Sequence, residues 1–279
     1  MFRIFDVSKT KGIALNRCYK YSTSSIMRAK IITIATHKGG TGKTVTAMAL
    51  GAGLARAKKK SLLVDLDPQA HSTLGLGLDV ANGERTLRDV FNEPPAALPT
   101  IIRKTHLDTL QVVPSHIRLE RIAHSLYARP RREDLLKRAF QPIVDSYDFI
   151  VIDCPPSLGV LTETGIAAAD LVIIPSQMEA RAADGIVDLL EVIAALKGEN
   201  WDNWRILLTK VDSRKSVTNE AVMAALARWQ DKILRTAIPQ SEPLNQAQIE
   251  RTDIFTFDLT SKGAAAYKAL AEEISQHGN

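Results

Sequence analysis

Short apolar runs alternate with amphipathic stretches along most of this 279-residue chain. The apolar runs are rich in Ile, Val and Leu and predict buried strands at 31–36, 61–66, 148–153, 169–177 and 205–210. The amphipathic stretches predict helices at 46–56, 118–128, 132–145, 185–196, 217–228 and 261–274. Strands that alternate with helices favour an α/β fold, in which a mostly parallel, twisted sheet carries helices on both faces.

The length of the chain favours a single domain, because about this many residues can bury one substantial core. No internal repeat or low-complexity tract divides it. Residues 81–99 are rich in Pro, Asn and Gly, and they predict a surface excursion rather than a domain boundary.

A glycine-rich loop, Lys-Gly-Gly-Thr-Gly-Lys-Thr at 38–44, joins the first predicted strand to the first predicted helix. Glycines let backbone amides approach phosphate oxygens, and the helix N-terminus adds partial positive charge. Lys43 would reach the β- and γ-phosphates, and the Thr44 hydroxyl would hold Mg²⁺. We therefore predict that ATP is bound by Lys38, Gly39, Gly40, Thr41, Gly42, Lys43, Thr44 and Val45.

Two further predicted strands end in carboxylates. Asp65 and Asp67 close the strand at 61–66, and Asp153 closes the strand at 148–153. Open α/β sheets bind ligands outside the carboxyl ends of their strands, so these acids are expected beside the phosphate loop. In nucleotide hydrolases that have such a loop, an acid at this position assists the Mg²⁺. The predicted magnesium set is Thr44, Asp67 and Asp153, with Asp65 as a further candidate acid.

The loop departs from the common phosphate-binding motif, since His37 stands where that motif has its first glycine and a second lysine, Lys38, follows. The pattern Lys-Gly-Gly-x-Gly-Lys-[Ser/Thr] resembles the deviant loop of the ParA/MinD superfamily of ATPases. The likeness runs from about residue 29 to 274 and is greatest for small Soj-like ParA proteins. It implies a P-loop NTPase domain at 29–279, after a basic extension at 1–28 that is either disordered or not translated.

The resemblance also implies residue roles. Lys38 would cross a dimer interface to the partner's nucleotide, Asp67 would orient the attacking water, and Pro239 would lie near the adenine. Lys38, Lys43 and Asp67 are therefore the implied catalytic set. Val45 is a departure, because a hydroxyl residue usually follows the loop threonine in this family.

The function implied by the resemblance is chromosome or plasmid partition. An ATP-bound homodimer would bind DNA without reading its sequence, and a ParB-like partner would stimulate hydrolysis and release, in a cytoplasmic, nucleoid-associated protein. Where relatives usually show arginines after Ile238-Pro239, this chain has Gln240 and Glu242. The candidate DNA contacts are Lys210, Arg214, Lys215, Arg251 and Lys262.

The net charge of +5 gives little further support for DNA binding, because most of it lies at the amino end. Five of the 36 basic and one of the 31 acidic side chains lie in residues 1–26, which leaves 31 basic against 30 acidic. Any DNA surface must therefore be a local patch. The extension is basic and contains Ser and Thr, which also fits an organelle transit peptide, and it lacks the apolar segment of a secretory signal.

Missing features separate the chain from other members of the superfamily. Cys154 is the only cysteine after residue 27, so the cluster-bridging cysteines of the nitrogenase iron protein are absent, and a small buried side chain is expected there. The stretch 264–279 is alanine-rich and acidic, unlike the basic helix with which MinD-type proteins bind membrane.

Two alternatives stay open. One is a related ATPase that positions a protein cargo through a small adaptor instead of a DNA partition complex. The other is a metabolic P-loop enzyme, such as an ATP-dependent amide synthase, which would need a substrate pocket facing the γ-phosphate.

Overall fold

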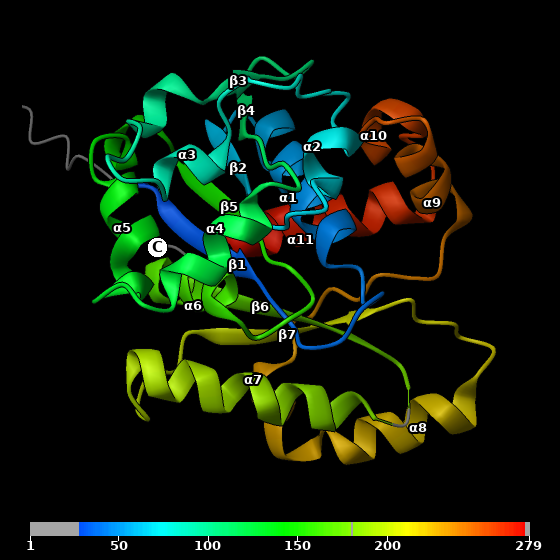
Figure 1. Ribbon diagram of the computed structural model, residues 1–279. Coiled ribbons are helices and arrows are strands. Elements are labelled where there is room, and N and C mark those ends of the chain that lie inside the picture. Colours follow the sequence, from blue (N-terminus) through cyan, green and yellow to red (C-terminus); the bar gives the residue numbers. More distant parts are fainter. Residues whose placement is uncertain (1–27, 180, 277–279) are drawn as a thin grey trace, which may run out of the picture.

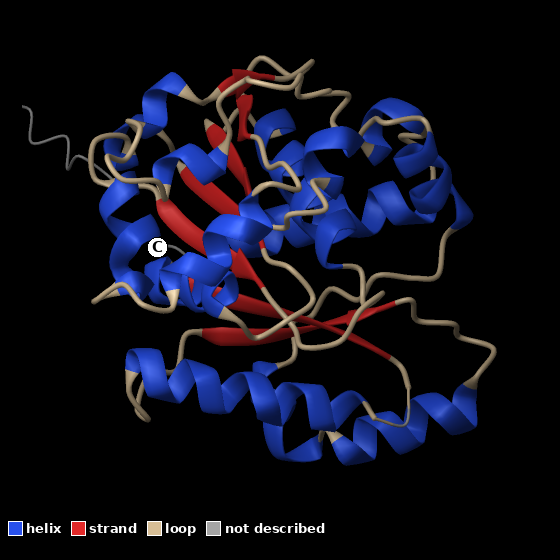
Figure 2. Ribbon diagram, in the orientation of Figure 1, coloured by secondary structure: helices blue, strands red, loops and turns tan. Residues whose placement is uncertain are grey.

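The computed structural model describes residues 28–179 and 181–276. Its seven described strands form one sheet in the order β3-β4-β2-β5-β1-β6-β7 (Figure 2), and all pairs are parallel except β3–β4. The strands are β1 Lys30–Ile34, β2 Ser61–Asp65, β3 Arg103–Lys104, β4 Leu110–Val113, β5 Phe149–Asp153, β6 Leu171–Gln177 and β7 Trp204–Thr209. The predicted mostly parallel α/β architecture is confirmed. The predicted basic extension at 1–28 lies outside the described part of the chain, except for Arg28.

Helices cover both faces of the sheet (Figure 1). The α-helices are α1 Lys43–Arg56, α2 His71–Gly75, α3 Leu87–Val90, α4 Leu119–Leu126, α5 Leu135–Phe140, α6 Val160–Ala168, α7 Ala182–Lys197, α8 Ser216–Ala225, α9 Glu242–Ile249, α10 Ile254–Phe257 and α11 Lys262–Gln276. Short 3₁₀ turns lie at Leu98–Thr100, Arg132–Asp134, Val144–Ser146 and Ala227–Lys232.

The core is divided by the sheet into two apolar clusters. Ile31 packs in one cluster with side chains of α4 to α8, while Ile32 and Ile34 pack in the other with α1, α9, α10 and α11. Successive strand side chains point to opposite faces, so an unbroken apolar run is what a strand buried on both sides requires. This explains why the central strands could be predicted from hydrophobicity.

Helix α1, which begins at the phosphate loop, is held by the last described helix. The hydroxyls of Thr46 and Tyr267 share a hydrogen bond of 3.0 Å inside the core. Gly53 permits close approach, since a Cβ built there would lie 3.0 Å from the Cβ of Ala271. The loop therefore extends from a helix that is fixed along its length.

Two predicted segments differ from the structure. The predicted helix at 132–145 is broken into short pieces, and α5 ends at Phe140 because Pro142 lacks an amide donor and restricts the residue before it. The expected surface excursion at 81–99 is wrong for its middle part. Helix α3 lies there and buries Leu87, with Phe91 buried just after it, and the Thr86 amide donates to the Asp89 carboxylate at its start (2.9 Å).

Candidate active site

The phosphate loop is folded as the glycine pattern predicts. β1 ends at Ile34 and α1 begins at Lys43, so the loop lies at the carboxyl edge of the sheet. Gly40 has φ of 74° and Gly42 has φ of 92°, in the left-handed region that favours glycine. The loop is also held from outside, where the Thr209 hydroxyl donates to the carbonyl of Thr41 (2.8 Å) and the Gln177 amide donates to the carbonyl of Gly40.

The Lys43 side chain is folded back into this loop. Its ammonium donates to the carbonyl oxygen of Lys38 at 3.0 Å, and the residue is only 7% exposed. Burial lowers the pKa of Lys43, while the nearby carboxylates of Asp153 and Asp67 oppose that shift. A buried cation within the loop is suited to meet the charge of a polyphosphate.

Three carboxylates are buried at or just after the ends of β2 and β5, and they differ in the hydrogen bonds that they accept. Asp65 accepts from the amide of Asp67 (3.1 Å) and from the amide and hydroxyl of Thr73 (2.8 and 2.7 Å). Asp153, its partner in the strand register, accepts from the Ser72 hydroxyl at 2.5 Å through Oδ2, and its buried Oδ1 has no hydrogen-bond partner. Burial raises the pKa of Asp65 to about 8 and that of Asp153 to about 6.

These residues fit a divalent cation. The carboxylates of Asp67 and Asp153 lie near one buried ammonium, that of Lys43, and no hydrogen bond to Asp153 Oδ1 offsets its desolvation. Carboxylate and hydroxyl oxygens are the hard ligands that Mg²⁺ prefers, usually with phosphate oxygens and water. Asp67 is buried and Thr44 lies in the first turn of α1, so Thr44, Asp67 and Asp153 stay the predicted magnesium set. The three bonds to Asp65 already use both of its oxygens.

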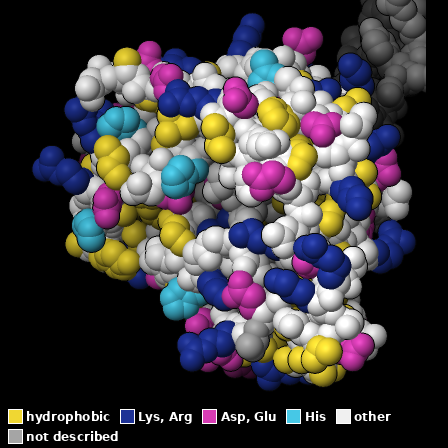
Figure 3. Space-filling view, turned by 90° about the vertical axis from the view of Figure 1, so that its right-hand side faces the viewer, with side chains coloured by type: hydrophobic (Ala, Val, Ile, Leu, Met, Phe, Trp, Pro, Cys, Tyr) yellow, Lys and Arg dark blue, Asp and Glu magenta, His cyan; other side chains and the backbone are white. Residues whose placement is uncertain are grey.

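A cleft of about 610 Å³ opens in front of the loop. Figure 3 views the face toward which the strand ends point, where basic side chains gather around and below a central hollow with acidic ones between them. The predicted residues that line the cleft are Gly39, Gly40, Gly42, Lys43, Thr44, Val45, Asp67, Lys210 and Arg251. The sequence interpretation missed Gln69, His71, Leu74, Gly75, Asn245, Gln248 and Ile249.

The missed residues come mainly from α2 and α9. The sequence could have indicated that α2 lies at the site, because α2 follows Asp67 closely. It gives no such indication for α9, because Asn245 and Gln248 are far from the loop along the chain. Pro239 is half-buried and is not among the residues found to line the cleft. It bridges to Val211, next to the cleft residue Lys210, so its contact with adenine stays a prediction.

Lys38 lies apart from Lys43. Its ammonium pairs with the carboxylate of Glu179, at the end of β6, and the two side chains are 44% and 47% exposed. Ion pairs this exposed contribute only about 0–1 kcal/mol, so Lys38 can exchange Glu179 for another anion at little cost. The neighbouring His37 pairs with Asp188 of α7 at 3.0 Å.

The candidate DNA residues differ in whether acidic side chains already pair with them. Arg214 makes a bidentate pair with Asp212 (2.9 and 2.8 Å), which lowers the pKa of Asp212 to about 2. Arg251 pairs with Asp79 at 2.9 Å, and Lys262 lies at the exposed start of α11. Within the described residues, Lys210 and Lys215 are exposed and form no ion pair.

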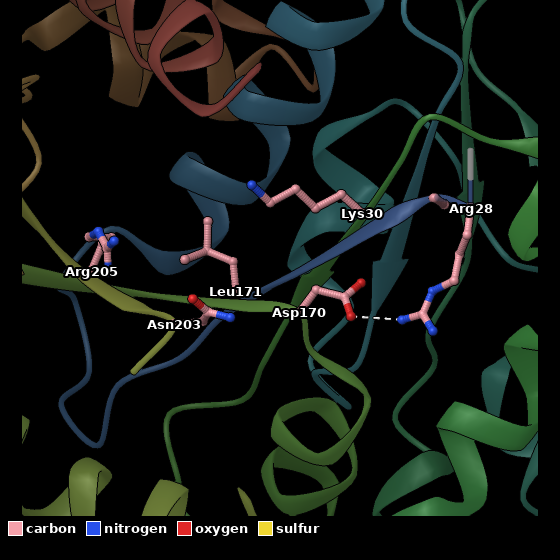
Figure 4. Close-up of a pocket in the computed structure, with 7 residues that line it drawn as sticks. Arg28, Lys30, Asp170, Leu171, Asn203 and Arg205 are labelled. Carbon is pink, nitrogen blue, oxygen red and sulfur yellow. Dashed lines mark hydrogen bonds and ion pairs between the residues drawn. The ribbon is translucent and has the colours of Figure 1, made fainter. Parts of the chain in front are cut away.

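Another pocket, of about 400 Å³, lies at the opposite edge of the sheet, at the amino ends of β1, β6 and β7. Figure 4 shows the Arg28–Asp170 pair (2.7 Å) at one side of it and Arg205 at the other. Nucleotides bind at the carboxyl ends of such strands, so this pocket is separate from the predicted site.

Two smaller expectations concern the rest of the chain. Cys154 is buried, as expected of a small apolar side chain, and burial raises the pKa of its thiol. None of the helices in the described ranges is both long and apolar enough to cross a membrane.

Comparison with known proteins identifies the family. A family model described as an AAA domain matches residues 29–206. The sporulation initiation inhibitor protein Soj of Bacillus subtilis is 38% identical over 252 residues, which cover 89% of this chain and 99% of that protein. The chromosome partitioning protein ParA of Myxococcus xanthus is 37% identical over 249 residues, covering 88% of this chain and 87% of that protein.

A solved structure gives the same fold with a nucleotide bound. The cobyrinic acid a,c-diamide synthase of Mycobacterium smegmatis, with bound ADP and magnesium, matches with a TM-score of 0.76 and 30% sequence identity, covering 89% of this chain and 95% of that chain. The chain therefore belongs to the ParA/MinD superfamily of P-loop ATPases, and within it to the group of Soj-like ParA proteins.

Proposed function

We propose that this chain is a ParA-type ATPase that dimerises on ATP, binds DNA non-specifically and drives chromosome or plasmid partition with a ParB-like partner. The observation that carries the proposal is the arrangement of its two loop lysines. Lys43 is buried beside the strand-end carboxylates, whereas Lys38 remains at the surface in a weak ion pair. This arrangement supports a role for Lys43 at the chain's own nucleotide and for Lys38 at the nucleotide of a second molecule.

The proposed reaction is hydrolysis of ATP to ADP and phosphate. The loop amides and Lys43 bind the phosphates, and Asp67 orients a water for attack. Magnesium, held by Thr44 with Asp67 and Asp153 beside it, would neutralise phosphate charge when bound. Little covalent chemistry is asked of the protein, because phosphoryl transfer depends mainly on positioning and charge stabilisation. We expect slow turnover without a partner, in a cytoplasmic protein that associates with the nucleoid when ATP is bound.

The role of Lys38 can be tested by Lys38→Ala. We expect ATP binding to persist while the ATP-bound dimer weakens by about 30-fold or more, because a charged contact across the interface is truncated. Loss of the Glu179 pair costs the monomer little. Light scattering after size-exclusion chromatography with ATP and with ADP measures the effect, and exposed Lys59→Ala is the matched control. An unchanged dimer would show that Lys38 does not act across the interface.

The DNA step can be tested with the full chain on non-specific duplex DNA, with ATP and with ADP, across a salt series. The basic extension is present in both nucleotide states, so binding by a single extension cannot by itself explain a difference between them. We expect binding with ATP alone, with a steep loss as salt rises. Lys210→Ala and Lys215→Ala should each reduce the salt slope by about 1.

Arg214→Ala should change that slope less, because its guanidinium is already paired with Asp212. Lys104→Ala, on the far edge strand β3, is the control and should leave binding unchanged. Absence of binding in either state, with ATP dimers still forming, would contradict the DNA step.

That outcome would favour the second candidate, an ATPase that positions a protein cargo through a small adaptor. A specific observation supports it: Arg214 and Arg251 are both engaged by acids, and Gln240 and Glu242 stand after Pro239. This chain therefore offers fewer free basic side chains for DNA than relatives that have arginines after the corresponding proline.

A further inference from the structure

The short helix α2 forms one wall of the nucleotide cleft, and it begins four residues after Asp67. Its start is not stabilised in the usual way. Ala70, the residue before the helix, has φ of 57°, which is strained for a side chain with a Cβ, and no side chain caps the helix. Something other than local sequence preference must therefore hold α2 in place.

The side chains of two consecutive residues of α2, Ser72 and Thr73, hold the helix in place through hydrogen bonds. Ser72 donates to Asp153 Oδ2 (2.5 Å), and Thr73 donates to Asp65 Oδ2 through both its hydroxyl and its amide. Ser72 and Thr73 are 0% and 1% exposed. Breaking a hydrogen bond between two buried groups leaves at least one of them unsatisfied, at the full cost of its desolvation.

These bonds reach Asp153 directly and the backbone of Asp67 through Asp65. Ser72 occupies Oδ2 of Asp153, and the Thr44 hydroxyl interacts with the same carboxyl group and opposes the rise of its pKa. Thr73 fixes Asp65, whose other oxygen accepts the backbone amide of Asp67. The Thr73 hydroxyl in turn accepts the amide of Ser115, which ties α2 to the end of β4. The segment that carries Asp67 is therefore tied to the ends of β2, β4 and β5.

We propose that Ser72 and Thr73 are positioning residues for ATP hydrolysis: Ser72 orients the carboxylate of Asp153, and Thr73, through Asp65, fixes the backbone that presents Asp67. Neither hydroxyl touches the reacting atoms. This inference rests on the proposed ATPase function. Asp65 then has a structural role: its side chain accepts hydrogen bonds from the protein and does not bind the nucleotide or its metal.

The test compares Ser72→Ala, Thr73→Val and Thr73→Ser. Residues that orient the groups of a metal site typically change activity by about 10- to 100-fold, so we expect kcat for ATP to fall by that amount in Ser72→Ala and Thr73→Val. Affinity for a fluorescent ATP analogue with Mg²⁺ should stay within about twofold, because the loop that binds phosphate is untouched. Thr73→Ser keeps the hydroxyl and should recover most of the wild-type kcat.

The matched control is Thr164→Val, which removes another fully buried threonine hydroxyl, in α6, from a bond to the Leu161 carbonyl. It should lower thermal stability as Thr73→Val does, but leave kcat unchanged. Hydrogen exchange gives a readout independent of turnover: amides of residues 67–75 should exchange faster in Ser72→Ala and Thr73→Val, and not in Thr164→Val.

The outcomes separate the two proposals. Wild-type protein that binds Mg-ATP without hydrolysing it, with DNA present or absent, overturns the proposed function and the positioning role with it. Normal wild-type turnover with unchanged kcat in Ser72→Ala and Thr73→Val overturns the positioning role alone. Equal loss of kcat in Thr73→Val and Thr164→Val, or no recovery in Thr73→Ser, shows a general packing effect and also overturns it.

Discussion

Replacing Lys43 by Ala is expected to reduce ATP affinity by about 100-fold or more, because it removes a buried, hydrogen-bonded charge that would meet the phosphates. The ammonium of Lys43 also lies near the buried carboxylates of Asp67 and Asp153. Without it, a polyanion would approach acids that have lost their nearest cation. Titration of a fluorescent ATP analogue, with isothermal calorimetry as a second method, measures the change.

Folding must be controlled in that variant, since the Lys43 ammonium also bonds the Lys38 carbonyl in the free protein. Circular dichroism and the unfolding temperature show whether the variant is native. Lys59→Ala removes an exposed lysine just after α1 and should bind ATP normally. A folded Lys43→Ala protein that binds ATP like the parent would exclude the loop as the phosphate site.

Replacing Asp67 by Ala is expected to lower ATP turnover by about 100-fold or more while leaving ATP binding and the ATP-bound dimer in place. The carboxylate accepts the Gln69 amide (2.9 Å) and lines the cleft, but it is not part of the phosphate loop. Its loss removes the group that orients water without removing the groups that bind nucleotide. Phosphate release and size-exclusion chromatography with ATP measure the two properties separately.

Asp79→Ala is a suitable control for this variant, because Asp79 is an exposed carboxylate paired with the cleft residue Arg251. It changes the charge near the site and should leave turnover within about twofold, as surface changes usually do. If Asp67→Ala turned over ATP at the parental rate, another group would have to orient the water. Loss of the dimer in Asp67→Ala would instead assign Asp67 to nucleotide binding.

The features that could be predicted are those that neighbouring residues determine. The loop at 38–44 and the acids after β2 and β5 were recognised because each motif is continuous in sequence and parallel strands bring their carboxyl ends to one edge. Strands β1, β2, β5, β6 and β7 were recognised because burial leaves nearly unbroken apolar runs in their sequences. The short edge strand β3 has no such run, since it contains only Arg103 and Lys104.

The features that could not be predicted depend on contacts between distant residues. Arg251 pairs with Asp79, 172 positions away, and no local pattern marks the two as partners. Helix α9 reaches the cleft through the packing of the second apolar cluster, in which Leu244 and Ala247 are buried. The roles of Ser72 and Thr73 were equally hidden, because a serine and a threonine in a short polar segment are compatible with an ordinary turn.

The bond between Thr46 and Tyr267 has a consequence for synthesis of the chain on the ribosome. The phosphate loop and α1 leave the ribosome early, but the helix that packs against α1 is made 221 positions later. Until then the apolar residues of α1 lack much of their native cover, and domains generally complete folding as units. The phosphate loop is therefore synthesised early, but the helix that packs behind it is synthesised last. We expect that a nascent chain cannot bind ATP in its native pocket until nearly the whole domain has been translated.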